Sequence, residues 1–435
     1  MRDFLPEDVR RRQYVIDIVR AVYERYGFEP LETPALENIE TLTGKYGEEG
    51  NKLIYKVLRR GEGESSGETD LALRYDLTVP LARVVADNRG KLPKFFKRYQ
   101  IQPVWRADRP ARGRFREFYQ CDVDAIGSTS PAIEAEMISA VSEVLQALGF
   151  TDFVVQLNHR ALLTAMLDAA GVAAAKHADA LIAIDKLDKI GRDKVADDLV
   201  ARGIERASAD ACLSAFEDPA AFEGMVQRSE LGAAAKRNVD EIMALAGATP
   251  AAGHVQFTPR LARGLSYYTG AIMEIAVPDL AGSLGGGGRY DGLIGMFSGE
   301  QIPACGFSLG LERILVVMGE RAMFPPAVQA SGPDVMVTIF EAALADESLR
   351  LATDLRKAGF RVEVYPDALR GGKDLGKAFK YADTRHARCV AVMGQDEHAR
   401  GEVKIKDMTT GAQQAVPRDA DALREHVAAL QSRTQ

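Results

Sequence analysis

The amino-acid sequence predicts an α+β protein that combines an antiparallel sheet, a mostly helical insertion and a C-terminal α/β unit. Two strand-like runs, residues 96–106 and 116–126, flank a polar loop and predict a long β-hairpin. Alanine dominates residues 161–253 and strand signals vanish there, which indicates helices. From residue 333 onward, short strand-like segments alternate with helical stretches, a pattern typical of an α/β domain with a mostly parallel sheet.

The N-terminal part of the chain shows both helical and strand-like periodicity. Residues 7–26 carry apolar side chains at helical spacing and predict an amphipathic helix, which Gly27 ends. The polar stretch 61–70 predicts a turn between two strands. Residues 131–148 predict a second long helix, and the segment 152–157 predicts the strand that follows it.

Composition narrows the class of protein. Of the 435 residues 46% are hydrophobic, which supports a sizeable core in two or three domains. The net charge of −7 argues against general DNA binding but leaves room for a local basic surface that binds RNA. No long apolar run or signal peptide is present, so no membrane span is expected. The four cysteines lie far apart, which predicts reduced thiols in the cytoplasm rather than disulfides or a zinc site.

The predicted hairpin is rich in arginine. Guanidinium groups keep their charge and can bind phosphate through two parallel hydrogen bonds. The hairpin is therefore a candidate cradle for a nucleoside triphosphate, although a solvated basic loop would have the same composition. The arginines of this stretch are Arg98, Arg106, Arg109, Arg112, Arg114 and Arg116.

Five segments of the chain resemble the signatures of one family. The segment 105–118 resembles motif 2 of the class II aminoacyl-tRNA synthetases, with an aromatic-Arg-x-acid step and a later Arg-x-x-x-Phe. The segment 306–313, GFSLGLER, resembles motif 3 of the same class. The segments 72–83, 262–270 (ARGLSYYTG) and 285–293 (GGGGRYDGL) are similar to signatures of the histidyl-tRNA synthetases. The resemblance covers nearly the whole chain and is weakest in the alanine-rich part.

The resemblance implies a division into domains. Residues 1–160 and 254–322 would form the catalytic domain around the antiparallel sheet, residues 161–253 a helical insertion domain, and residues 333–435 an anticodon-binding domain. The N-terminal helix and the extended segment after it correspond to motif 1, which implies a homodimer. Periodicity alone leaves open whether the apolar stripe of that helix forms a dimer contact or ordinary core.

The implied activity is the ATP-dependent activation of histidine to histidyl-adenylate, followed by transfer of histidine to tRNA(His). Because ATP is a substrate, Mg²⁺ is implied too, but its ligands cannot be located in the sequence. Fixed positive charge promotes such a transfer, and losing one preorganised group costs about 3–4 kcal/mol in the transition state. The resemblance assigns catalysis to Arg106, Arg263 and Arg313, and ATP binding to Arg106, Asp108, Arg114, Phe118 and Arg313.

A histidine pocket has to hold an ammonium and an imidazole. A pocket that hydrogen-bonds its substrate rejects analogues lacking the partner by roughly 10⁴–10⁵, so no editing domain is expected. The resemblance implies that Asp76, Thr78 and Gln120 bind the ammonium and that Asp124 and Tyr268 bind the imidazole. The complete implied set is Asp76, Thr78, Gln120, Asp124, Arg263, Tyr267, Tyr268 and Tyr290.

Three features of this pocket stay open at the level of sequence. Asp124 could instead be an exposed carboxylate on a strand. The glycines of 285–293 could form a merely structural turn, and they do not match the G-x-G-x-x-G dinucleotide pattern because Tyr290 stands where the third glycine must be. Ser266 stands where the family pattern usually has Asp, and this departure bears on the orientation of Arg263.

Two other functions compete with this interpretation. GFSLG also fits the G-x-S-x-G nucleophile elbow of α/β-hydrolases, with Ser308 as the nucleophile, but that elbow requires a parallel sheet. The second alternative is a synthetase-like regulatory subunit that binds histidine without activating it. Such subunits lack the C-terminal domain and usually disrupt the activating arginines. This chain has residues 333–435 in the place of that domain and keeps Arg106, Arg263 and Arg313. Histidine-dependent exchange between ATP and pyrophosphate separates the two functions.

The C-terminal unit resembles the anticodon-binding domain of several class II synthetases. Its residues 369–389 are basic, and basic side chains on phosphates with aromatic rings under unstacked bases are typical of RNA recognition. Tyr381 and Phe379 could stack on bases, although a core position is favoured for Phe379, and a solvated helix face would have the same charges. The basic residues are Arg370, Lys373, Lys377, Lys380, Arg385 and Arg388.

Overall fold

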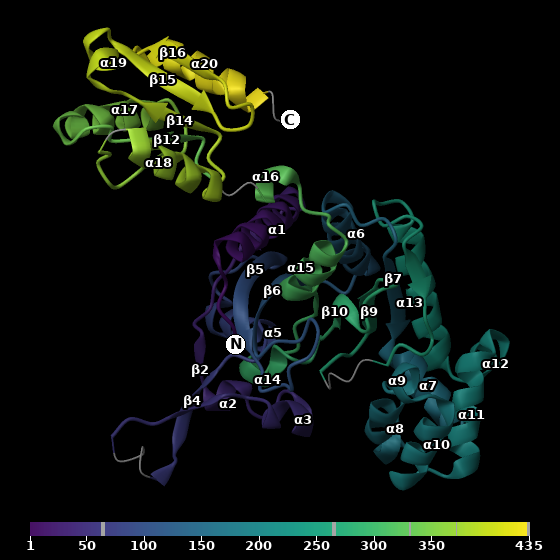
Figure 1. Cartoon of the computed structure of the whole chain (residues 1–435). Coiled ribbons are helices and arrows are strands. Elements are labelled where there is room, and N and C mark those ends of the chain that lie inside the picture. The colour runs from purple at the N-terminus through teal and green to yellow at the C-terminus, as the bar shows by residue number, and fades with distance from the viewer. Residues whose placement is uncertain (62–65, 263–266, 330–331, 371, 433–435) are drawn as a thin grey trace. The chain divides into compact units, whose positions relative to one another are not determined.

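The chain folds into two compact units, Met1–Phe324 and Pro325–Gln435, each described here by itself (Figure 1). The structure is a computed structural model. It describes the chain except for residues 62–65, 263–266, 330–331, 371 and 433–435. The expected α+β class is confirmed, because the first unit carries a large sheet with helices and the second is a separate α/β domain.

The first unit is built on an eight-stranded sheet with the order β1-β5-β6-β11-β10-β9-β7-β8. Its strands are β1 (Glu29–Pro30), β5 (Phe96–Trp105), β6 (Glu117–Ile126), β7 (Val154–His159), β8 (Val255–Phe257), β9 (Ala271–Ala276), β10 (Ser283–Arg289) and β11 (Ala304–Gly310). All pairings from β5 to β7 are antiparallel, as predicted, and the long β5–β6 hairpin is present.

The two edge pairs of this sheet differ from the prediction of an antiparallel sheet, because β1–β5 and β7–β8 are parallel. A parallel pair requires a crossover of about a dozen residues or more. The helices between β7 and β8 supply one crossover, and the segment from β2 to α5 supplies the other. The sheet is therefore mixed, with an antiparallel centre.

Helices α1 (Pro6–Arg25), α6 (Pro131–Ala147) and α15 (Leu311–Glu320) pack on one face of the sheet (Figure 1). Along β6, buried apolar side chains at positions 121, 123 and 125 alternate with buried polar side chains at 120, 122 and 124. The Tyr23 hydroxyl of α1 donates to the Cys121 carbonyl at 3.2 Å, which anchors that helix to the strand. The polar positions therefore face away from these helices.

The apolar stripe of α1 belongs to the core of its own chain. Val15, Val19 and Val22 are almost completely buried without any second copy. The alternative left open by periodicity is thus decided: this stripe is core, and a dimer contact has to use other residues.

A small antiparallel sheet with the order β2-β4-β3 precedes helix α5 in the chain. Its elements and the helices around it are β2 (Leu36–Asn38), β3 (Lys56–Leu58), β4 (Thr69–Leu73), α2 (Ile39–Leu42), α3 (Gly47–Lys52), α5 (Thr78–Asn88) and α14 (Gly295–Ser298). The predicted turn at 61–70 lies between β3 and β4, partly outside the described residues. Residues 74–78, which lead from β4 into α5, carry several of the expected pocket side chains.

Between β7 and β8 every regular element of the described chain is helical, in line with the alanine-rich composition. These helices are α7 (Arg160–Ala169), η1 (Ala174–Lys176), α8 (His177–Ile184), α9 (Leu187–Ile190), α10 (Arg192–Ala201), α11 (Arg206–Glu217), α12 (Pro219–Val226) and α13 (Glu230–Ala246). They belong to the first compact unit. Within the described residues, no helix is both long and apolar enough to cross a membrane.

The second unit has a five-stranded sheet with the order β13-β12-β14-β15-β16. Its elements, with α16 of the connecting segment, are α16 (Pro326–Gln329), β12 (Val335–Val337), η2 (Ala342–Leu344), α17 (Ala345–Lys357), β13 (Val362–Val364), α18 (Gly372–Thr384), β14 (Cys389–Val392), α19 (Gln395–Ala399), β15 (Glu402–Asp407), β16 (Gln413–Pro417) and α20 (Ala420–Ser432). The prediction of a mostly parallel sheet is wrong, since β14–β15 and β15–β16 are antiparallel. The short connections after β14 and β15 allow only antiparallel neighbours there.

Candidate active site

Arg106 directly follows β5 and begins the loop of the long hairpin. Its backbone N–H donates to the Arg116 carbonyl at 2.9 Å, which closes the base of the loop. Its guanidinium carbon lies 4.3 Å from the centre of the Tyr75 ring and 5.1 Å from that of the Phe118 ring, and its Nε donates to the Tyr75 carbonyl at 3.0 Å. Cation–π contacts orient a planar guanidinium. Two of the residues expected to bind ATP, Arg106 and Phe118, are therefore neighbours.

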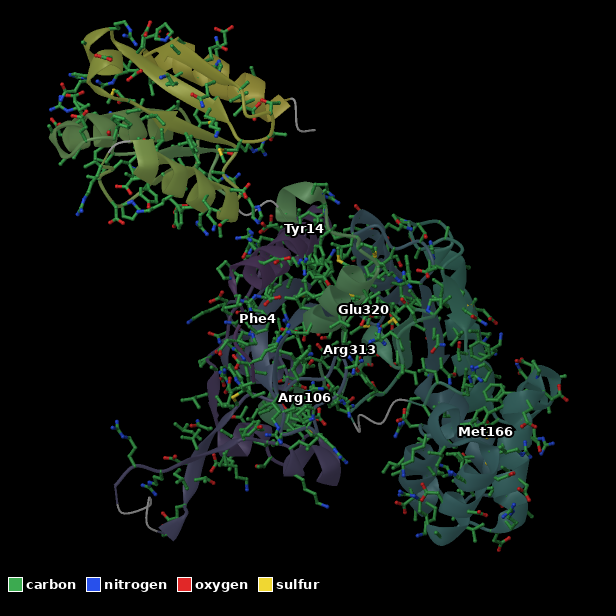
Figure 2. The ribbon with its side chains drawn as sticks, viewed as in Figure 1. Phe4, Tyr14, Arg106, Met166, Arg313 and Glu320 are labelled. Carbon is green, nitrogen blue, oxygen red and sulfur yellow. The ribbon has the colours of Figure 1, made fainter. Side chains whose placement is uncertain are left out.

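Arg313 lies in the first turn of α15 and contacts the same hairpin loop. Its Nε donates to the Gly113 carbonyl at 3.3 Å, and its Nη1 donates to the Ser283 carbonyl at 2.6 Å. Gly113 has a φ of +67°, and a Cβ there would lie 3.3 Å from the Arg313 Cγ, so the loop turns closely over this side chain. Arg106 and Arg313, labelled in Figure 2 within the first unit, thus contact opposite ends of one loop.

The other arginines of the hairpin are dispersed. Arg98 lies in the middle of β5 and is completely buried. Arg112 forms an ion pair with Glu320 and donates to the Asp279 carbonyl at 3.0 Å. Arg114 is half-exposed, and its Nη1 lies 3.9 Å from the Asp108 carboxylate. The expected phosphate-binding cradle therefore contains fewer arginines than the hairpin does.

Glycines of β10 and β11 leave space for Asp124 and Tyr268, two of the residues expected to bind histidine. A Cβ on Gly306 would lie 1.9 Å from Oδ1 of Asp124, and a Cβ on Gly288 would lie 2.9 Å from the Tyr268 ring. No real side chain tolerates such distances. The glycines of 285–293 thus allow strands and side chains to approach closely, beyond a mere turn.

Asp124 is a buried carboxylate held by two partners. The Tyr290 hydroxyl donates to its Oδ1, and the Arg98 Nη2 lies 2.7 Å from its Oδ2. Burial raises the pKa of Asp124, whereas Arg98 and the Tyr290 hydroxyl act in the opposite direction. The alternative of an exposed strand carboxylate is wrong, because Asp124 is only 2% exposed.

Asp76 is a second buried carboxylate, located just before α5. It accepts hydrogen bonds from the Tyr46 hydroxyl at 2.9 Å, the Val79 N–H at 3.1 Å and the Tyr267 hydroxyl at 3.5 Å. Burial raises its pKa, and the Val79 N–H and the charge of Arg106 oppose that rise. The latter effect places the guanidinium of the hairpin within electrostatic range of this carboxylate.

The expected tyrosines form one aromatic cluster. The ring centres of Tyr267 and Tyr268 lie 5.1 Å apart, and those of Tyr267 and Tyr290 lie 6.1 Å apart. Burial raises the pKa of Tyr267 and Tyr290 well above the ordinary value, so both hydroxyls remain protonated donors. The Thr78 hydroxyl interacts with Tyr267 and acts against that rise. Together with Asp76, these side chains link α5, the segment before β9 and the end of β10.

Gln120 completes the set of expected pocket residues that the structure describes. Its Nε2 donates to the Ser308 Oγ at 2.6 Å. Arg263 and Ser266, the remaining residues singled out from the sequence, lie outside the described residues.

Three side chains of the cluster, Tyr46, Tyr75 and Asp122, were missed by sequence reasoning, and a fourth, Arg98, was expected only as part of the phosphate cradle. Tyr46 and Tyr75 contact Asp76 and Arg106, and their rings lie 4.6 Å apart. Arg98 and Asp122 occupy the same face of β5 and β6 as Asp124. For Asp122 the signal was available, since it stands between two expected residues with the two-residue period of a strand.

Glu312, the acidic member of motif 3, is also buried near the hairpin. Its Oε2 accepts from the Tyr119 N–H at 2.9 Å, while its Oε1 has no hydrogen-bond partner among the described residues. Burial raises the pKa of Glu312 to about 7. It ties the start of α15 to β6 and thereby sets the position of Arg313.

The hydrolase alternative is wrong. Ser308 lies within β11, which pairs antiparallel with both of its neighbours. Its Oγ accepts from Gln120 and is not exposed on a turn between a parallel strand and a helix, as a nucleophile elbow requires.

The second unit contains a cavity of about 520 Å³ between its sheet and helices α18 and α19. In its wall the Lys406 Nζ lies 3.8 Å from the centre of the Phe379 ring. Lys404 also lines the cavity but pairs with Glu397 at 3.2 Å. Amide groups of Gln395 and Gln413 add hydrogen-bonding capacity. The wall further carries three carboxylates, those of Glu341, Asp396 and Glu397. The part of the wall that suits a flat ring next to a negative charge is therefore Lys406 over Phe379.

The basic run of the second unit is mostly engaged elsewhere. Lys377 pairs with Asp374 at 2.8 Å and Arg385 pairs with Glu363 at 3.1 Å, both within the unit. The Tyr381 hydroxyl also donates to Glu363, at 2.8 Å. The charges of this helix therefore stabilise the fold at least in part, whereas Phe379, half-buried, faces the cavity.

Comparison with known proteins gives the same family along both units. Residues 1–314 match the family profile described as Histidyl-tRNA synthetase, and residues 334–423 match the profile described as Anticodon binding domain. The Histidine–tRNA ligase of Gloeobacter violaceus is 42% identical over 448 residues, which cover 96% of this chain and 95% of that protein. The Histidine–tRNA ligase of Porphyromonas gingivalis is 40% identical over 444 residues, 97% of this chain and 96% of that protein.

Solved structures agree with the sequence relatives. The histidyl-tRNA synthetase from Nostoc sp. PCC 7120 matches with a TM-score of 0.78 and 30% identity, over 98% of this chain and 97% of that chain. An ATP phosphoribosyltransferase regulatory subunit/histidyl-tRNA synthetase from Bacillus halodurans C matches with a TM-score of 0.71, but at 22% identity this likeness concerns the fold alone. With a family profile over most of its length and relatives at about 40% identity along nearly the whole sequence, the chain belongs to the histidyl-tRNA synthetase family.

Proposed function

We propose that the buried cluster around Arg106, Asp76 and Asp124 is the site where histidine and ATP react. As a member of its family, the chain activates histidine with ATP to histidyl-adenylate and transfers histidine to tRNA(His). One observation carries the assignment of the site. The Arg106 Nε donates at 3.0 Å to the carbonyl of Tyr75, the residue directly before Asp76, so the cation assigned to phosphate and the carboxylate assigned to the ammonium are neighbours.

Activation joins a carboxylate oxygen of histidine to the α-phosphorus and breaks the bond to pyrophosphate. Negative charge grows on the equatorial phosphate oxygens, and a fixed guanidinium stabilises it without reorganisation. Arg106 is assigned to the α-phosphate because Tyr75 and Phe118 orient its plane. Arg313 is assigned to the far phosphates, since the hairpin loop holds it at the start of α15.

Other hairpin residues complete the nucleotide site in this proposal. Arg114 is exposed enough to reach the terminal phosphate, and Asp108 lies within 3.9 Å of its guanidinium. The adenine stacks on Phe118, with Arg313 on its other face. Arg263 is assigned to the α-phosphate and the substrate carboxylate on the resemblance of its motif alone.

The histidine side chain binds above Asp124 in this proposal. Tyr290 and Arg98 oppose the effect of burial on the Asp124 pKa and so favour the carboxylate, which accepts an imidazole N–H. Tyr268 supplies the second polar contact to the ring. Asp76, Thr78 and Gln120 bind the α-ammonium, and Tyr267 fixes Asp76 through its hydroxyl.

The second unit is assigned to tRNA. Within the cavity, the Phe379 ring with Lys406 over it offers a stacking surface and a positive charge, the two elements of single-stranded RNA binding. We assign residues 333–435 to anticodon binding, residues 161–253 to a helical insertion domain, and residues 1–160 with 254–322 to catalysis.

The proposed reaction also involves Mg²⁺, because ATP is its substrate. Among the described residues no group of three metal-binding side chains stands together. Mg²⁺ carried by ATP needs only one or two carboxylate ligands beside the phosphates, so such an ion does not require a cluster of three. We assign no protein ligand to it.

A homodimer in the cytoplasm is consistent with the surface and the thiols. Leu36 and Phe95 of the first unit are exposed apolar side chains that a second copy could cover. All four cysteines are buried and unpaired, as in a reducing compartment. Sedimentation at micromolar concentration tests the dimer.

The reaction is tested by ATP–pyrophosphate exchange with each of the twenty amino acids. Exchange is expected with histidine and with no other amino acid. Absence of exchange with purified chain would favour the regulatory function instead. Deletion of residues 333–435 is expected to preserve histidyl-adenylate formation and to weaken tRNA charging sharply, and equal charging by the truncated chain would contradict the assignment of the second unit.

A further inference from the structure

Asp122 stands between two residues of the proposed histidine pocket. On β6 it shares a face with Gln120 and Asp124, and its cross-strand neighbours are Gln100 on β5 and Ser308 on β11. Its side chain is only 2% exposed. Nothing in the proposed reaction uses it so far.

Three buried acceptors on this face have no hydrogen-bond partner in the described part of the chain, namely the Gln120 Oε1, the Asp122 Oδ1 and the Asp124 Oδ2. The Asp124 Oδ2 lies 2.7 Å from the Arg98 Nη2 and is compensated by that ion pair. Leaving a buried polar atom unsatisfied is costly, so the other two acceptors call for a physical explanation. A donor that is not part of the protein would satisfy both atoms.

The orientation of the two acceptors is fixed by Ser308. Gln120 Nε2 donates to the Ser308 Oγ at 2.6 Å, which leaves the Gln120 Oε1 on the opposite side of the amide. The single proton of the Ser308 hydroxyl interacts with the Asp122 carboxylate. This relay of contacts through Ser308 leaves one acceptor of each side chain, the Gln120 Oε1 and the Asp122 Oδ1, directed away from the serine.

The charges around Asp122 indicate that the donor that would satisfy the Asp122 Oδ1 and the Gln120 Oε1 is a cation. Asp124 and Asp76 both act electrostatically on Asp122 and disfavour its charged form. Arg98 is the guanidinium that opposes them, and its Nη groups already contact Asp124, the Gln100 Oε1 and the Leu77 carbonyl. Asp122 and Asp124 therefore share one completely buried guanidinium, whereas Asp76 interacts with the charge of Arg106. A compact ammonium with several N–H donors would correct this imbalance.

We propose that Asp122 is a substrate-binding residue whose Oδ1, together with the Gln120 Oε1, accepts hydrogen bonds from the α-ammonium of histidine. This inference rests on the proposed function and adds a residue to the set that the resemblance implies. Asp122 is the next residue after Gln120 on this face of β6, so it can share with Gln120 the ammonium end of the proposed pocket, while Asp124 marks the imidazole end.

The contact also makes histidine binding depend on pH. Burial raises the pKa of Asp122 to about 7, the charges of Asp124 and Asp76 act in the same direction, and Arg98 opposes them. From α1, Tyr23 is the other titratable group within electrostatic range, and it stays neutral because burial raises its pKa well above 10.0. Above pH 7 Asp122 is a charged acceptor for the ammonium, and below pH 7 it is a neutral acid that binds a cation poorly.

The test compares Asp122→Asn with the full-length wild-type chain in histidine-dependent ATP–pyrophosphate exchange. The variant keeps the shape of the side chain and removes the charge, so the KM for histidine is expected to rise about 10- to 100-fold, as for a lost hydrogen bond to a charged group. The KM for ATP and the melting temperature are expected to stay within error, because the variant loses both the attraction of Asp122 to Arg98 and its repulsion by Asp124 and Asp76. Asp87→Asn, an exposed carboxylate on α5, is the matched control.

Competitive inhibitors locate the contact on the substrate. Histamine carries the imidazole and the ammonium, whereas imidazole-propanoate carries the imidazole without the ammonium. Asp122→Asn is expected to weaken histamine about 10- to 100-fold and to leave imidazole-propanoate within about threefold. Equal weakening of both inhibitors would place Asp122 at the ring or in a purely structural role and would overturn the inference.

The pH profile supplies a readout that a structural role would not move. The ratio of the histidine KM of the variant to that of the wild type cancels the titration of histidine itself. This ratio is expected to fall about five- to tenfold from pH 8 to pH 6, because only about a tenth of a group with a pKa of about 7 stays charged at pH 6, and a constant ratio would contradict the inference. Ser308→Ala, which removes the relay, is expected to raise the histidine KM about threefold; no change would count against the proposed orientation.

Failure of this inference can be told apart from failure of the proposed function. A wild-type chain without histidine-dependent exchange would refute the proposed function. An active wild type with an unaltered Asp122→Asn variant would refute only the role of Asp122.

Discussion

Arg98 and Asp124 form a buried ion pair across β5 and β6, with the Arg98 Nη2 2.7 Å from the Asp124 Oδ2. The two side chains are 0% and 3% exposed, so neither charge is shared with solvent. Buried pairs of this kind add little net stability, but removing one partner leaves the other charge uncompensated. In the proposed site this pair holds a carboxylate at the imidazole end, and the cost of burying it can be measured.

Replacing Arg98 by methionine is expected to lower the free energy of unfolding by about 3–5 kcal/mol, because Asp124 then stays buried with only the Tyr290 hydroxyl as partner. Urea denaturation at pH 7.5 measures the change. Arg20→Met is the matched control, since Arg20 forms an exposed pair with Asp17 on α1. Its expected effect is below about 1 kcal/mol. Similar losses in the two variants would show that burial of the Arg98 pair is irrelevant.

Gly306→Ala is expected to displace Asp124, because the new Cβ would lie 1.9 Å from its Oδ1. Overpacking of this kind costs about 1–3 kcal/mol of folding stability. The displaced carboxylate is expected to lower the kcat/KM for histidine in the exchange reaction about 10- to 100-fold, as for a lost hydrogen bond to a charged group. The control is Gly319→Ala in α15, where nothing lies within 4 Å of the added Cβ. That variant should be as active as wild type and slightly more stable. A fully active Gly306→Ala enzyme would disprove the role of the glycine.

Arg106→Lys is expected to lower the rate of histidine-dependent exchange by about 100- to 1,000-fold, or roughly 3–4 kcal/mol. Lysine keeps the charge but lacks the planar group that Tyr75 and Phe118 orient. Arg60→Lys, at an exposed position, controls for the substitution itself. If Arg106→Lys retained the wild-type rate, Arg106 would not be the group that stabilises the α-phosphate.

Because His159 is largely buried, we expect the free energy of unfolding to decrease at acidic pH. Its Nδ1 accepts the Ala161 N–H at 3.1 Å and caps α7, so the ring is neutral at that nitrogen. Burial, helped by the charge of Arg289, lowers its pKa to about 4, below the ordinary 6.5. Above pH 6.5 both folded and unfolded chains carry a neutral ring. Between pH 6.5 and 4 only the unfolded chain takes up the proton, so stability falls as the pH is lowered.

The measurement compares wild type with His159→Asn, which keeps a capping side chain without a titrating ring. The stability of wild type relative to this variant is expected to drop by about 3 kcal/mol from pH 7 to pH 4. Groups that titrate in both proteins cancel in the difference. A difference that does not change with pH would mean that His159 has an ordinary pKa.

Lys406→Gln is expected to reduce the kcat/KM for tRNA charging by about tenfold and to leave ATP–pyrophosphate exchange unchanged, because stacking and charge at such a site contribute about 1–3 kcal/mol per base. The lysine lies over the Phe379 ring in the cavity of the second unit. Lys377→Gln is the control, since that side chain pairs with Asp374. A larger effect from Lys377→Gln would move the RNA contact to the exposed face of α18.

Much of this molecule follows from local sequence signals. The hairpin of β5 and β6, the helical stretch after β7 and the division before β12 each have periodicity or turn residues that act over a few positions. The Arg106 step and the GFSLGLER segment are likewise contiguous, so their resemblance to motifs 2 and 3 was visible without a fold. The likeness of the two glycine-containing signatures decided the family for the same reason.

Other features depend on residues that are distant in the chain. Whether the stripe of α1 was core, whether Ser308 was exposed, and whether Asp124 was buried could not be read from periods of two or four residues. The parallel edges β1–β5 and β7–β8 depend on crossovers, and a strand carries no local signal for the direction of its neighbour. Sequence by itself determined which side chains were available for chemistry. Tertiary structure decided which of these side chains are buried together. Because burial removes water from Arg98, Asp122 and Asp124, their charges interact strongly with one another.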